Sequence, residues 1–243
     1  MAEPLLRLAM HAEIRLGGEA LTVAELQART HRAAKALNER YGDHVSSPWE
    51  AEGARQLRVA LALPGTAHGS ARLTEMAFEL LLRLHPQPLA IGLGLSVEPA
   101  LAAARARDAC ESAGRQRLLA QAMGFDESLD RPGLGQGVSG TWSVLGALVQ
   151  NWTERQAQFV RWILRDGVLD WRREPARFVP ERPRKEAARA FSVSPSVVTE
   201  SLQAADVAAF RAGMWSAAWQ MAEVARSYRS VAASASSSSM MRS

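Results

Sequence analysis

The sequence has almost no cysteine and no long apolar run. Cys110 is the only cysteine among the 243 residues, so neither an intramolecular disulfide nor a thiolate metal cluster can form. We expect Cys110 to be a small buried residue, the alternative being a reactive thiol. No segment approaches the roughly 20 consecutive apolar residues that a membrane-spanning helix requires. The first residues lack the basic start and apolar run of a secretory signal, so we expect a cytoplasmic protein without membrane contact.

Lysine is also nearly absent. Only Lys35 and Lys185 are lysine among the 29 basic residues, the others are arginine, and the formal net charge is +4. Arginine suits bidentate contacts with phosphates and base edges. A GC-rich genome would also replace lysine by arginine, whatever the function. The composition therefore permits nucleic-acid binding without requiring it.

Periodicity in the first hundred residues predicts alternating strands and helices. Thr22 and Glu25 have the spacing of a capping box at the start of the first helix, and Gly42 ends that helix. The order strand, helix, strand, strand, helix, strand predicts a ferredoxin-like βαββαβ domain, in which two helices cover one face of a four-stranded antiparallel sheet. The predicted strands are residues 5–14, 47–52, 57–63 and 88–97, and the predicted helices are residues 21–42 and 70–85.

The remaining chain is predicted to be helical, so the fold class is α+β with an all-α C-terminal part. A helix over residues 99–123 leads to a glycine-rich stretch that marks the expected domain boundary. The final residues are rich in serine and alanine and are expected to be disordered. The predicted organisation is a ferredoxin-like palm domain at 1–125, a glycine-rich linker at 126–140, a helix-turn-helix domain at 141–229 and a disordered tail at 230–243.

The strongest local motif is a helix-turn-helix between Lys185 and Leu202. Such a motif needs a small residue where the helices cross, a short turn, and apolar residues that seat the second helix. Ala188 is the small residue, and Ser194 followed by Pro195 is typical of a helix start. Ser192 stands where glycine is commonest in the turn. The seating residues are expected to be Phe191, Val193, Val198 and Leu202.

This motif predicts double-stranded DNA as the partner. Ser194 and the outward residues of the second helix would face the bases, and basic residues nearby would contact phosphates. The base-facing residues are Ser194, Ser196, Val197, Thr199, Glu200 and Gln203, and the phosphate-contacting residues are Arg184, Lys185, Arg189, Arg172, Arg173, Arg177 and Arg182. The alternative is a helix pair used only for packing or dimerisation. Trp215 and Trp219 are four residues apart on the last helix, which favours a core or a homodimer seam there.

The predicted palm lacks the paired carboxylates of a two-metal phosphoryl-transfer site. Glu13 ends the first strand, but no carboxylate follows Gly53 in the hairpin turn. The sequence contains no phosphate-binding loop, no dinucleotide fingerprint and no histidine pair at metal-ligand spacing, so we expect no cofactor and no enzyme activity. The alternative is Mg²⁺-dependent nucleotide chemistry that uses Glu13 with Glu50 or Glu52.

Four segments together resemble the SatD family, small bacterial proteins that join a nucleotide-cyclase-like palm to a C-terminal helix-turn-helix. The resemblance implies a DNA-associated regulatory or stress-response role, with the palm serving assembly or ligand sensing. Family members tend to carry aspartates at the first strand end and on the central hairpin, where this sequence has Glu13 and Ala54. The four segments are ALNERYG at 36–42, LLLRLHPQPLAIGLGLSVEP at 80–99, NWTERQAQFVRWIL at 151–164 and EAARAFSVSPSVVTESLQAA at 186–205.

Overall fold

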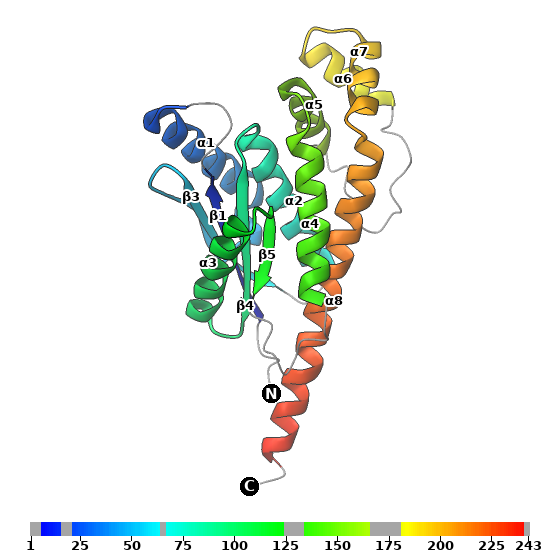
Figure 1. The fold of residues 1–243 in the computed structure, drawn as a ribbon. Coiled ribbons are helices and arrows are strands. Elements are labelled where there is room, and N and C mark those ends of the chain that lie inside the picture. The colour runs from blue at the N-terminus through cyan, green and yellow to red at the C-terminus, as the bar shows by residue number, and fades with distance from the viewer. Residues whose placement is uncertain (1–5, 16–20, 64–66, 124–133, 166–180, 241–243) are drawn as a thin grey trace.

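A computed structural model describes residues 6–15, 21–63, 67–123, 134–165 and 181–240. It shows an α+β protein in which a twisted sheet is flanked by helices, and two long helices run side by side along one edge of the sheet (Figure 1). The predicted fold class is confirmed. None of the described helices is long and apolar enough to cross a membrane.

The sheet has five strands in the order β2-β3-β1-β4-β5. The first four are antiparallel and occur in the order expected of a ferredoxin-like sheet. The fifth strand was not predicted, and it pairs in parallel with β4. The strands are β1 (Leu6–Ile14), β2 (Ser47–Glu52), β3 (Gln56–Leu63), β4 (Leu89–Ser96) and β5 (Ala120–Met123).

Two helices, α1 (Val23–Tyr41) and α2 (Ala67–Leu84), pack on one face of this sheet. The predicted capping box starts α1, since the Thr22 hydroxyl accepts from the amide of Glu25 and the Glu25 carboxylate accepts from the amide of Thr22. A short 3-10 turn, η1 (Gly42–His44), follows α1. Alternate residues of β1 enter the core below these helices: Leu8, Met10, Ala12 and Ile14.

The opposite face is covered by α3 (Pro99–Arg115), a contact that the sequence did not predict. All of β4 is therefore buried. Gly92 and Gly94 allow the close approach, because a Cβ at either position would collide with the backbone of α3. Cys110 lies in this contact, where its thiol donates to the carbonyl oxygen of Ala90 (3.3 Å) and burial raises its pKa to about 12. Its predicted role as a small buried residue is confirmed.

The helix expected over 99–123 ends at Arg115, because the chain takes a left-handed turn there. Arg117 has φ 58°, and the amide of Leu118 donates to the carbonyl of Ala113. This hydrogen bond is typical of a Schellman helix end, with arginine at the position that glycine usually occupies. The chain can then extend into β5.

The glycine-rich segment after β5 also differs from the prediction. Residues 134–140, expected to belong to a linker, form the first turns of α4 (Leu134–Gln150). The helix forms despite its glycines because its apolar residues recur at helical spacing and are buried against β5 and the last helix. These residues are Val138, Trp142, Leu145 and Val149.

Four helices complete the chain: α5 (Glu154–Arg165), α6 (Glu181–Ala190), α7 (Pro195–Ala204) and α8 (Val207–Met240). Residues 230–240 were expected to be disordered, but they continue α8. This segment is rich in alanine and serine and contains no glycine or proline that would end a helix. α8 lies along α2 and α4 (Figure 1). Phe78 of α2 contacts the rings of Trp142 and Phe210, so one hydrophobic core joins the sheet to the C-terminal helices.

The contact between β4 and α3 generates a stability prediction. Replacing Gly94 by alanine should lower the free energy of unfolding by about 1–3 kcal/mol, because the added methyl group meets the backbone of Ala102. The control is Gly137→Ala in α4, where no atom lies within 4 Å of the new Cβ. That change should raise stability by about 1 kcal/mol through helix propensity. Urea unfolding measures both changes in the free energy of unfolding. Equal changes in the two variants would contradict the close packing of β4 on α3.

Candidate functional site

The predicted helix-turn-helix is present as α6, a short turn and α7. Ser192 occupies the turn in a left-handed conformation with φ 52°. The amide of Val193 donates to the carbonyl of Ala188 (2.9 Å), which ends α6. Ser194 then caps α7 by accepting from the amide of Val197, and Pro195 is the first helical residue. Ser192, Ser194 and Pro195 therefore have the roles in the turn that the sequence predicted.

The second helix is seated by the residues that the motif requires. Ala188 is buried where the helices meet, and Val198 and Leu202 are buried on the inner side of α7. Phe191 packs edge-on against Phe159 of α5, with ring centroids 4.9 Å apart. Val193 is half-buried against the same core. The helix pair therefore rests on α5, with its outer side open.

The outer side of α7 is polar and smaller than predicted. Ser194, Ser196, Glu200 and Gln203 are exposed, and the hydroxyl oxygens of Ser194 and Ser196 lie 2.8 Å apart. Val197 was expected to face outward, but its half-buried side chain packs against the core because it lies beside Val198 on the seated side.

Thr199, another predicted base-facing residue, is half-buried and is already hydrogen-bonded. Its hydroxyl donates to the carbonyl of Pro195 (2.9 Å) and accepts from Nη1 of Arg184 (3.2 Å). The hydrogen bond fixes Arg184 across the two helices. Thr199 and Arg184 thus stabilise the motif from within, and any contact with a ligand would have to compete with this hydrogen bond.

Basic residues border the polar surface of α7. Lys185 and Arg189 are exposed on α6, and Arg184 lies half-buried beside them. Arg172, Arg173 and Arg177 lie outside the described residues, as does the side chain of Arg182. α6 and α7 lie at the end of the molecule opposite the C-terminus, where a long partner can approach (Figure 1).

In the palm, arginines hold the carboxylates that could have bound a metal. Glu50 and Glu52 both form ion pairs with Arg58, at 2.8 and 2.7 Å, and Glu13 lies 3.9 Å from Arg55. Among the described residues, no group of three or more His, Cys, Asp or Glu side chains could hold a metal ion.

No protein-family model matches this chain, and no curated protein matches its sequence. Sequence reasoning also missed an arginine-lined pocket between α1, α2 and α5. No motif could have revealed it, since its residues are scattered from Arg29 to Arg161 along the chain.

The left-handed turn residue provides a test of the motif. Ser192→Gly should raise the free energy of unfolding by about 1 kcal/mol, because glycine adopts this conformation without the steric cost that serine bears. Ser201→Gly, in the middle of α7, is the matched control and should lower stability by about 0.5 kcal/mol. Chemical denaturation compares the two. Destabilisation by Ser192→Gly would show that the turn differs from the one described.

Proposed function

We propose that this protein binds double-stranded DNA through α6 and α7 and acts as a regulator. One observation carries the proposal: a helix-turn-helix whose second helix is seated by apolar residues and presents a polar, exposed outer side at one end of the molecule. Lys185 and Arg189 are exposed on α6 beside that side, and their charges suit contacts with phosphates.

The proposed contacts follow the chemistry of the exposed groups. With α7 in the major groove, the hydroxyl of Ser196 and the amide of Gln203 reach base edges, and Glu200 accepts from a cytosine amino group. Lys185 and Arg189 bind phosphates beside the groove and position the helix.

We propose that the palm has no catalytic role and serves assembly or ligand sensing. The ion pairs of Arg58 with Glu50 and Glu52 support this, because both carboxylates already have a cationic partner. The resemblance to the SatD family supports a regulatory or stress-response role. A cytoplasmic location is part of the same proposal, since chromosomal DNA is reached there.

We also propose that the protein is a homodimer. Trp219 is 53% exposed on α8, and it stacks with Trp215 at a centroid separation of 6.5 Å. An aromatic pair with one exposed and one half-buried ring on a long helix supports pairing of two copies, and a dimer would place two copies of α7 on two half-sites. Sedimentation should give the dimer mass for the protein and a lower mass for Trp219→Ala. A monomeric mass for the unaltered protein would contradict the proposal.

The DNA-binding proposal is tested by titrating labelled random duplex DNA with protein at low and at physiological salt. Affinity should fall as salt rises, because binding releases counterions from the phosphates. Lys185→Ala combined with Arg189→Ala should weaken binding and reduce the slope of log affinity against log salt by about 2. Fluorescence anisotropy measures both quantities.

The control variant removes two positive charges from a part of the surface far from α6 in the sequence. Lys35 and Arg115 have exposed side chains, at 79% and 67%, on α1 and α3, and among the described residues each forms an ion pair with a neighbour one helical turn away. Changing both to alanine should leave the salt slope unchanged and have little effect on stability. An equal loss of DNA affinity in the two double variants, or no DNA binding at low salt, would refute the proposed interface.

A further inference from the structure

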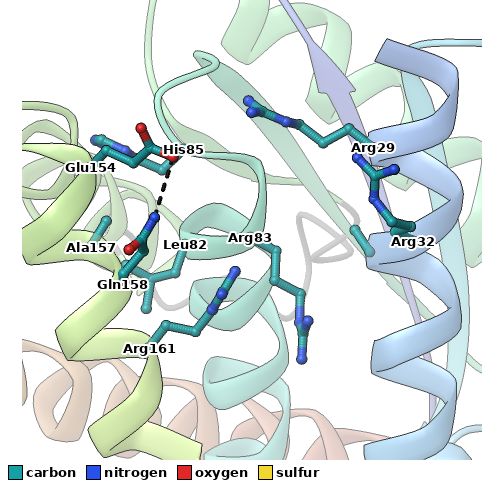
Figure 2. A pocket seen from close by; sticks show the side chains of 10 residues that line it. Arg29, Arg32, Leu82, Arg83, His85, Glu154, Ala157, Gln158 and Arg161 are labelled. Carbon is teal, nitrogen blue, oxygen red and sulfur yellow. Dashed lines mark hydrogen bonds between the residues drawn. The ribbon is translucent and has the colours of Figure 1, made fainter. Parts of the chain in front are cut away.

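A pocket of ≈ 350 Å³ lies between α1, α2 and α5. Arg29 and Arg32 extend into it from α1 on one side, Arg161 extends from α5 on the other, and Arg83 of α2 lies between them (Figure 2). The walls are completed by Ala33, Leu82, His85, Glu154, Ala157 and Gln158. Four arginines thus face one cavity of a size that suits a small ligand.

The positive charge of this pocket is only partly balanced. Arg83 is held by the buried carboxylate of Glu79, to which its Nε donates at 2.9 Å. Within the described residues, no carboxylate forms an ion pair with Arg29, Arg32 or Arg161. Glu154 is the only acidic residue in the lining, and its carboxylate accepts from the amide of Gln158 at 3.3 Å.

One polar atom of the lining is buried without a partner. Nη1 of Arg29 makes no hydrogen bond within the described residues, whereas the ring of His85 lies beside backbone carbonyls. His85 is only 8% exposed, and burial lowers its pKa, partly opposed by the nearby carbonyls of Trp152 and Val149. Buried polar groups in native proteins are nearly always satisfied, so unsatisfied groups beside a cavity indicate a ligand that supplies acceptors.

Arg161 also lies in an environment that disfavours its positive charge. Burial and then repulsion by Arg83 lower the pKa of its guanidinium, and the carboxylate of Glu79 opposes this shift only in part. Keeping a half-buried arginine next to another cation costs free energy, which an anion in the cavity would offset. A guanidinium fork matches the oxygens of a phosphate group in a bidentate manner.

We propose that this pocket binds a small ligand through a phosphate or diphosphate group. Arginines on opposite walls can contact different oxygens of the same group. A diphosphate provides enough negative charge to balance the three guanidinium groups that have no ion-pair partner among the described residues. The pocket is lined on α5 by Glu154, Ala157, Gln158 and Arg161, whereas Phe159 of α5 packs on Phe191 below the helix-turn-helix, and the inference does not rest on DNA binding.

The test uses inorganic pyrophosphate as the probe and the full-length protein. Isothermal titration at constant ionic strength should show saturable binding of pyrophosphate, with weaker binding of inorganic phosphate and none of chloride. Arg32→Gln and Arg161→Gln should each raise the Kd for pyrophosphate about tenfold, since each removes a charge-assisted hydrogen bond. Arg115→Gln, an exposed arginine on α3, should leave the Kd unchanged.

Folding is checked by circular dichroism, and Arg32 is exposed, so its variant should fold even if Arg161→Gln does not. No saturable binding of pyrophosphate, or an unchanged Kd in Arg32→Gln, would overturn the proposal. Titration of the same variants with duplex DNA distinguishes the two sites. If pyrophosphate fails to bind while the pocket variants lose DNA affinity, the arginines belong to a DNA surface and the small-ligand site is refuted.

Discussion

The carboxylate of Glu79 is buried where α1, α2 and α5 meet, and its partners determine how these helices sit. It accepts from Nη1 of Arg40 (2.8 Å), from the hydroxyl of Tyr41 (2.9 Å) and from Arg83. Burial and then Glu79 raise the pKa of Tyr41, so its hydroxyl stays a donor. Arg40 also donates to the carbonyl of Leu164 at the end of α5 (2.9 Å). Removing one partner from a buried ion pair typically costs about 3–5 kcal/mol, so this network holds the junction together.

Hydrophobic residues of α2 also connect the sheet to the C-terminal helices. The α2 residues from Leu73 to Leu84 are buried against the sheet on one side and against α8 on the other, with Arg83 as the half-buried exception. Phe78 packs on Trp142 and Phe210, which join α4 and α8 to this core. The sheet and the helix-turn-helix are therefore parts of one packed body.

This arrangement relates the two proposed sites. α5 lines the arginine pocket with Ala157 and Arg161, and its opposite side seats the recognition motif through Phe159 and Phe191. An anion in the pocket would remove the repulsion between Arg83 and Arg161 and so favour the position of α5 that is described. The same helix would thus serve ligand binding and DNA binding.

Sequence patterns predicted the first four strands, the capped first helix and the helix-turn-helix, because in each case local chemistry and burial favour the same structure. They missed β5 because four residues carry little periodicity and because an arginine, Arg117, ends α3 where glycine is usual. They missed the start of α4 because burial of Val138 and Trp142 outweighs the poor helix propensity of glycine. The arginine pocket depends on tertiary contacts between three helices, which no linear pattern records.

Whether α6 and α7 contact DNA is the central question, and hydrogen exchange of the backbone amides with and without duplex DNA answers it most directly. A bound duplex should slow exchange in the turn at 191–194 and in the first turn of α7, while amides in α3 exchange at an unchanged rate. Unchanged exchange across residues 181–204 at a saturating DNA concentration, or protection confined to another surface, would contradict the account.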